Sequence, residues 1–101
     1  MTNYIYGYAR VSTQQQDLIR QLDIIEKYNC TEVLTEKISG TKTNRPELEK
    51  LKALVRDGDT IVIESFSRLG RSTKDLIELV EYFENKGVKL ISTKENFDTH
   101  T

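Results

Sequence analysis

The sequence predicts an α/β fold: a doubly wound, mostly parallel sheet of about four strands flanked by helices. Four runs rich in β-branched and aromatic residues alternate with three runs whose apolar residues recur at helical spacing. The connections between these runs are short, as in doubly wound sheets. A length of 101 residues with 37% hydrophobic content supports one packed core. We therefore expect residues 1–101 to form one domain.

The first half of the chain contains two predicted strands and one predicted helix. Residues 3–11, "NYIYGYARV", are rich in Tyr and Ile and indicate a buried strand. Residues 15–29 place leucines and isoleucines at helical spacing. Residues 31–37 form a second, weaker strand, and the composition of residues 39–44 indicates a loop.

The second half repeats this alternation. Pro46 suits the first turn of a helix whose apolar positions continue to Val55. Residues 60–66, "TIVIESF", are the clearest buried strand. Ser72, with an acidic residue three positions later, is typical of a helix N-cap. The helix that follows leads to a fourth strand at residues 88–93.

Composition excludes several classes of protein. A charged fraction of 31% with a net charge of −1 gives no overall attraction to nucleic acid or membrane. Cys30 is the only cysteine and cannot form an internal disulfide, and His100 is the only histidine, which we expect to be solvated. No apolar run approaches the length of a membrane helix, and no signal peptide is visible.

Positive charge is concentrated where the predicted strands end. Function in such sheets lies at the carboxyl ends of the strands, which here are segments 8–16, 37–46 and 65–74. These segments hold none of the 16 acidic residues and seven of the 15 basic ones, namely Arg10, Lys37, Lys42, Arg45, Arg68, Arg71 and Lys74. The pattern predicts a cationic rim that binds an anion such as phosphate, although a solvated surface that happens to be basic is the alternative.

Ser12 is the candidate nucleophile at this rim. Period two places Arg10 and Ser12 on the same side of the strand end. A serine hydroxyl needs a base, a metal or strong positive charge to attack, and the segments supply positive charge. Four arginines could neutralise a phosphate and stabilise its transition state: Arg10, Arg45, Arg68 and Arg71. If helical, the last two lie on one helix face. The alternative for Ser12 alone is a helix N-cap.

Competing chemistries lack essential residues. There is no G-x-S-x-G motif and no histidine near the segments, which argues against a Ser-His-Asp hydrolase. The segments contain no acidic pair to hold two metal ions, and no glycine-rich nucleotide motif is present. Cys30 lacks an arginine at phosphatase spacing, so we interpret it as a packing residue.

Three motifs together resemble the catalytic domain of the serine recombinases, the resolvase/invertase family. They are "YARVSTQQQ" (8–16), "SGTKTNRPEL" (39–48) and "SRLGRS" (67–72), and the resemblance covers essentially the whole chain in order. It implies that Ser12 forms a phosphoserine bond with a broken DNA end, while the four arginines contact the scissile phosphate. It also implies supporting roles for Gln16, Gln21 and Ser39.

The resemblance further implies how such a protein works. The family cuts both DNA strands, rotates half of the complex and religates, with no cofactor, ATP or metal. The expected partners are DNA and further copies of the full-length protein, as a homodimer or tetramer, in a prokaryotic cytoplasm and without a membrane. We expect these 101 residues to precede the family's dimerisation helix and DNA-binding domain, and to be monomeric and inactive on their own.

Two positions depart from the family pattern. Ser67, a further supporting position, stands where the family commonly has Asp, which leaves carboxylate-assisted proton transfer open. Leu54 occupies a position that is basic in some relatives, and we assign it to the apolar stripe of its helix. The alternative function is a non-catalytic phosphate-binding or nucleic-acid-binding module on the same fold.

Overall fold

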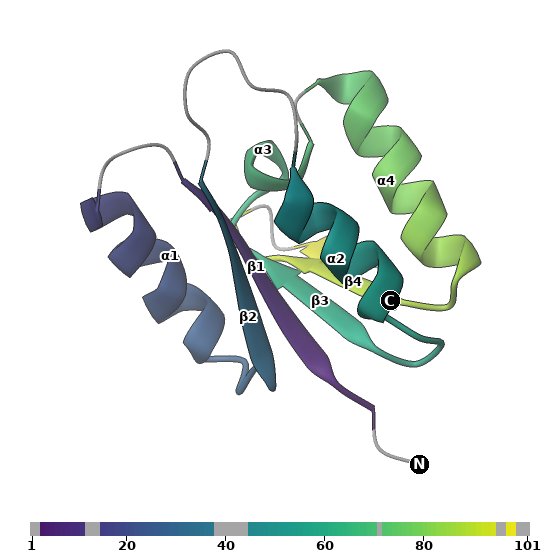
Figure 1. Cartoon of the computed structure of the whole chain (residues 1–101), viewed down its shortest axis with the longest axis horizontal. Helices are drawn as coiled ribbons and strands as arrows, with labels where there is room; N and C mark the ends of the chain where they lie inside the picture. The colour runs from purple at the N-terminus through teal and green to yellow at the C-terminus, as the bar shows by residue number, and fades with distance from the viewer. Residues whose placement is uncertain (1–2, 12–14, 38–44, 71, 95–96, 99–101) are drawn as a thin grey trace.

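The computed structural model describes residues 3–11, 15–37, 45–70, 72–94 and 97–98, with side chains omitted for 15–17 and 97–98 (Figure 1). The elements in chain order are β1 (Ile5–Val11), α1 (Gln15–Glu26), β2 (Glu32–Lys37), α2 (Pro46–Leu54), β3 (Thr60–Ile63), α3 (Phe66–Leu69), α4 (Thr73–Asn85), β4 (Lys89–Ser92) and β5 (Phe97–Asp98). The predicted alternation of strands and helices is therefore confirmed.

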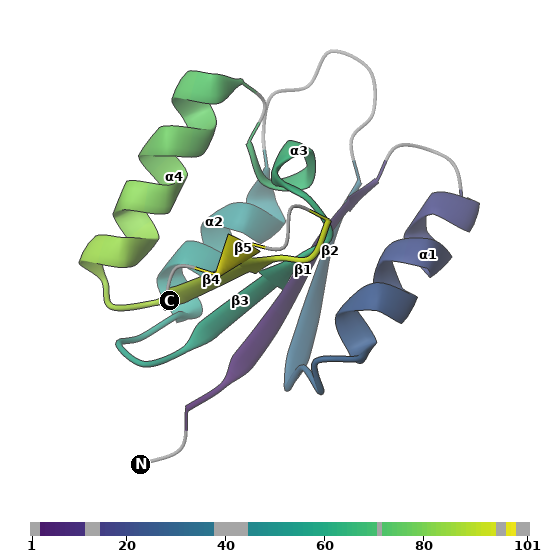
Figure 2. The same ribbon diagram turned by 180° about the vertical axis from the view of Figure 1, so that it is seen from behind.

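The sheet has the order β2-β1-β3-β4-β5. Strands β1 to β4 are parallel, with Tyr8 opposite both Leu34 and Ile63, and β5 adds a short antiparallel edge. Helix α1 covers one face of the sheet, while α2 and α4 cover the other (Figures 1 and 2). The fold class predicted from the sequence is confirmed, as a sheet between two helical layers.

The two faces of the sheet build unequal cores. Alternate β1 residues such as Tyr6 and Tyr8 face α2 and α4, and pack with Leu51 and Phe83 in the larger cluster. Leu54 packs against the same cluster, as its place in the apolar stripe predicted. The face under α1 is smaller, and its fully buried members are Ala9, Ile25 and Val62.

Two details differ from the sequence prediction. The third strand ends at Ile63, and Phe66 already begins α3, a single turn too short for periodicity to reveal. Helix α3 ends at Leu69 because Gly70 is extended, and Arg71 lies outside the described residues. Beyond the fourth predicted strand, Phe97–Asp98 form β5, a short strand for which the sequence analysis predicts no element.

The connections define where the strand order reverses. From β1 the chain leads to β2 on one side, whereas from β3 it leads to β4 on the other. The carboxyl ends of β1 and β3 are therefore the topological switch point, where ligands bind in open α/β sheets. Among the described residues, no helix is long and apolar enough to cross a membrane.

Candidate active site

The structure brings the described site residues together at the switch point. Arg10 lies near the end of β1, Arg45 directly precedes α2, and Arg68 lies in α3. Gln21 and Ser67, two predicted supporting residues, lie in α1 and α3. Three other predicted residues, Ser12, Ser39 and Arg71, lie outside the described residues, as does the side chain of Gln16.

Arg10 is the centre of this group. Its side chain is buried, and its Nη2 donates to the carbonyl oxygens of Ser67 and, at 3.3 Å, Gly70. Burial lowers the pKa of the Arg10 guanidinium, and the neighbouring cations Arg45 and Arg68 act in the same direction. Its Nη1 is also buried, and it has no hydrogen-bond partner among the residues that the structure describes. A buried unpaired donor is costly, so an anion bound at this atom would be stabilising.

The backbone of Arg10 also organises its neighbours. Its carbonyl oxygen accepts a hydrogen bond from Gln21 Nε2 at 3.2 Å and another from Arg68 Nη1 at 3.4 Å. Gln21 is fully buried between α1 and β1. One peptide group at the end of β1 therefore links the first helix to the arginine of α3.

Arg45 joins α2 to the α3–α4 region. Its Nη1 donates to the Leu69 carbonyl oxygen at 2.9 Å, and its Nη2 pairs with the Asp75 carboxylate at 3.0 Å. The Arg45 and Arg10 side chains together donate to carbonyl groups at the carboxyl end of α3. Positive charge is stabilising at this end of a helix, because the last carbonyl groups have no partner within the helix. The arginines thus hold α3 in place as well as gathering charge.

Three carboxylates at the site belong to residues that flank, in the sequence, the segments of the predicted cationic rim. Glu36, Glu64 and Asp75 each lie one residue beyond a segment edge. Glu64 pairs with Arg68, its Oε1 lying 3.4 Å from Nε, and Asp75 pairs with Arg45. Within the described residues, acidic side chains from just outside the segments therefore pair with two arginines of the predicted cationic rim.

Glu36 is a buried residue that the sequence reasoning missed. Its Oε1 accepts the backbone N–H of Leu48 at 3.1 Å, in the first turn of α2, and lies 3.5 Å from the Tyr8 hydroxyl. Burial, followed by the nearby Glu36 charge, raises the pKa of Tyr8 strongly, so this hydroxyl remains protonated. The signal in the sequence was the shared face of Leu34 and Glu36 on a strand whose alternate residues are buried.

Other predictions concern local roles. Ser72 is confirmed as the N-cap of α4, because its Oγ accepts from the backbone N–H of Asp75 at 3.1 Å. Ser67 Oγ lies 2.9 Å from Ser65 Oγ. Cys30 is half-buried against the α1 core, and burial raises the pKa of its thiol, in agreement with a packing role. His100 lies outside the described residues.

The described residues offer no set of donors for a metal ion. Within that part of the chain, no three side chains of His, Cys, Asp or Glu gather in a suitable arrangement. The chemistry that the described geometry supports is anion binding by guanidinium groups at the ends of β1 and β3.

Solved structures share this fold. The N-terminal catalytic domain of TP901-1 integrase matches with a TM-score of 0.77 and 28% identity, over 96% of this chain and 82% of that one. The catalytic domain of ISC1926 TnpA, an IS607-like serine recombinase, matches with a TM-score of 0.73 and 31% identity, over 88% of this chain and 66% of that one. The fold is therefore that of a serine recombinase catalytic domain.

Sequence comparison then identifies the family. The family model for "Resolvase, N terminal domain" matches residues 5–101, and this chain belongs to that family. It is 47% identical to the transposon Tn917 resolvase of Enterococcus faecalis, over 96% of this chain and 53% of the relative. It is 46% identical to the transposon Tn552 DNA-invertase BinR of Staphylococcus aureus, over 89% and 46%. The chain thus spans about half the length of these curated relatives.

Proposed function

We propose that this chain is the catalytic domain of a site-specific DNA recombinase. The observation that carries the proposal is the convergence of Arg10, Arg45 and Arg68 at the switch point of the sheet. Membership of the resolvase family and the names of the relatives, a resolvase and a DNA-invertase, support it. The whole protein that contains these 101 residues would act on DNA in a prokaryotic cytoplasm, assembled as a homodimer or tetramer.

The proposed nucleophile is Ser12, which follows Arg10 by two residues. Its hydroxyl oxygen attacks the phosphorus of a DNA phosphodiester and forms a phosphoserine bond. The bond from phosphorus to one sugar oxygen breaks, and that oxygen leaves as a hydroxyl group after taking up a proton. The serine hydroxyl gives up its own proton in the same exchange. Religation is the reverse reaction with a new DNA end, so the exchange conserves the number of ester bonds.

The arginines would stabilise the charge that develops on the phosphate. Arg10, Arg45, Arg68 and Arg71 are the proposed contacts, with Gln16, Gln21, Ser39 and Ser67 in support. In the described part, Nη1 of Arg10 is a desolvated donor without a hydrogen-bond partner, on a guanidinium group held in place by its Nη2 contacts. Such preorganised donors lower the barrier because little reorganisation is needed during the reaction.

Replacing Ser12 tests the proposal. In the whole protein, we expect Ser12→Ala to abolish the denaturant-resistant protein–DNA adduct on a suicide substrate, while a gel shift shows nearly unchanged binding. Thr31→Ala is the control, because Thr31 is an exposed hydroxyl residue at the other end of the sheet. Normal cleavage by the Ser12 variant would remove Ser12 from the mechanism. DNA binding by the wild-type protein without any adduct would favour a non-catalytic binding module.

A further inference from the structure

Glu64 is a buried carboxylate at the end of β3 that the proposed chemistry does not use. Its backbone oxygen accepts the Thr93 hydroxyl at 2.9 Å and the Lys94 N–H at 2.7 Å, which ties its backbone to the end of β4. Its side chain is only 6% exposed. A carboxylate buried to this extent is costly unless cations and hydrogen bonds compensate for the lost hydration.

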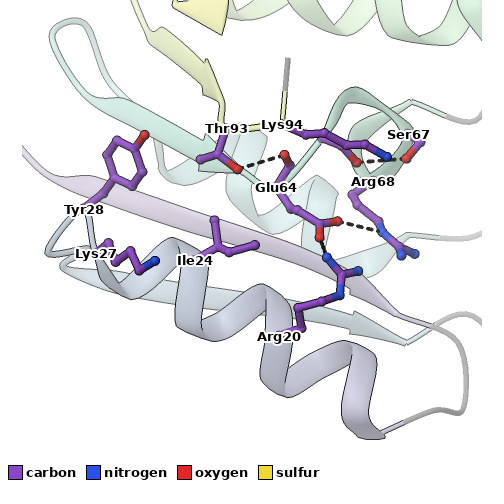
Figure 3. A pocket seen from close by; sticks show the side chains of 10 residues that line it. Arg20, Ile24, Lys27, Tyr28, Glu64, Ser67, Arg68, Thr93 and Lys94 are labelled. Atoms are coloured by element: carbon purple, nitrogen blue, oxygen red, sulfur yellow. Dashed lines mark hydrogen bonds and ion pairs between the residues drawn. The ribbon is translucent and has the colours of Figure 1, made fainter. Parts of the chain in front are cut away.

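Two arginines from different elements provide this compensation. Arg68 of α3 approaches Glu64 Oε1 with its Nε at 3.4 Å, and Arg20 of α1 forms an ion pair with Oε2. Figure 3 shows both guanidinium groups pointing at the Glu64 carboxylate, one from α1 and the other from α3. These three residues form part of the wall of a pocket of about 660 Å³ between α1 and the ends of β3 and β4.

The contact with Glu64 fixes the orientation of Arg68. A guanidinium is planar, so two contacts at different nitrogens define the direction of its whole plane. For Arg68 these are Nε with Glu64 and Nη1 with the Arg10 carbonyl oxygen, at 3.4 Å in each case. The Nε side of the group is therefore turned to Glu64, and the Nη1 side is turned to the end of β1.

We propose that Glu64 is a positioning residue for Arg68, and that Arg20 in turn holds the Glu64 carboxylate from α1. This role rests on the proposed function, because it concerns how Arg68 meets the phosphate. In this role the carboxylate acts through Arg68: it sets the angle at which the guanidinium reaches the end of β1. Helix α1 becomes part of the site's support through Arg20 as well as through Gln21.

Glu64→Gln is the informative variant. Glutamine keeps the shape and an oxygen that can accept from Arg68 Nε, but it removes the charge that orders both arginines. At saturating DNA, we expect the single-turnover cleavage rate of the whole protein to fall roughly 10- to 100-fold, as for a misplaced catalytic group. The reaction amplitude and the Kd for DNA should stay unchanged. Glu49→Gln is the matched control, because Glu49 pairs with Lys52 on the exposed side of α2.

A purely structural ion pair would behave differently. It would lower the active fraction, and so the amplitude, without changing the rate constant of the molecules that remain folded. A double-mutant cycle then tests whether Glu64 acts through Arg68. In an Arg68→Lys background, we expect Glu64→Gln to cost less than about 3-fold, because the planar group that it orients is already gone.

Several outcomes would overturn the proposal: an unchanged rate, a faster rate, a loss of amplitude alone, or the full loss repeated in the Arg68→Lys background. A wild-type protein that forms no adduct would instead refute the proposed function. The contact itself is then decided by the NMR signal of the Arg68 Nε–H. Protection from exchange that is lost in Glu64→Gln supports positioning, and an identical signal in both proteins contradicts it.

Discussion

At the scale of single residues, Arg10 connects α1, β1 and α3 through its side chain and its carbonyl oxygen. Its guanidinium holds α3 through two carbonyl oxygens, and its own carbonyl oxygen receives Gln21 and Arg68. A lysine could not replace it, because one ammonium lacks the planar fork that reaches several acceptors from a buried position. The same residue therefore supports the local structure and offers a buried donor to an anion.

Arg68→Lys keeps the positive charge but removes the planar guanidinium group that can donate two parallel hydrogen bonds. We expect this variant to lose on the order of 10²- to 10³-fold in single-turnover cleavage, the usual loss for one transition-state donor. Arg56→Lys is the control, because Arg56 is exposed and lies at the opposite end of β3. Rates for the Arg68 variant that match the wild-type rate would show that this arginine does not bind the reacting phosphate.

At the scale of elements, the side chain of Ile25 in α1 packs directly against the backbone of Gly7 in β1, where there is no room for a side chain. A Cβ at Gly7 would overlap Cγ2 of Ile25 and lie 3.3 Å from both Cys30 Sγ and Val33 Cγ2. The close approach lets Gln21 reach the Arg10 carbonyl oxygen. The packing of one helix thus determines part of the site's hydrogen bonding.

Gly7→Ala should therefore destabilise the fold. We expect the free energy of unfolding to fall by about 1–3 kcal/mol, measured by urea denaturation, because the core is overpacked. Ile25→Ala should cost less in the Gly7→Ala background than in the wild-type protein, since it removes the colliding group. A neutral Gly7→Ala variant, or strictly additive costs, would contradict the close packing of α1.

At the scale of the whole molecule, the two layers of helices are held with unequal strength. Among the described residues, the cluster under α2 and α4 contains large buried residues such as Tyr8, Leu51 and Phe83, whereas the cluster under α1 has few fully buried members. Local opening has a lower free energy where less apolar surface is buried. We therefore expect the layer that carries Arg20 and Gln21 to have the lower free energy of opening.

Hydrogen exchange can measure this difference. We expect backbone amides in the middle of α1 to exchange faster than those in the middle of α4, by the difference in opening free energy between the two layers. The measurement compares residues 19–24 with residues 77–83 in the same protein. The conditions are chosen so that reclosing is faster than chemical exchange, and the exchange rate then reports the opening equilibrium. Equal protection in both helices would show that the polar contacts of α1 offset its smaller core.

The charge arrangement also predicts the response to a chelator. Glu64, Asp75 and Glu36 are held by arginines or by a backbone N–H, so they are poorly placed to ligate a divalent ion. We expect EDTA to leave single-turnover cleavage by the whole protein unchanged. A loss of cleavage that Mg²⁺ restores, with DNA binding unaffected, would favour a metal-assisted mechanism instead.

Much of the fold could be predicted from local patterns. The three longer helices each carry an apolar period near 3.6 residues, whereas β1 and β3 were predicted from continuous runs of aromatic and β-branched residues, in agreement with their continuous burial. Helix α3 and strand β5 span four and two residues, so neither is long enough to show such a period. Their formation depends on contacts with distant elements, such as the arginines on the carbonyl oxygens of α3.

The sequence by itself determined the layered fold and the strand ends at which the arginines gather. It also favoured the hypothesis that guanidinium groups, and not a metal ion, bind the phosphate. Only the tertiary structure decided how those arginines are paired. Arg45 meets Asp75 across 30 positions, and Arg20 of α1 meets Glu64 of a different layer. Periodicity reports which face of an element is buried, but an ion pair depends on where two elements lie in space. That position follows from the packing of the whole core, here from the closeness of α1 to Gly7.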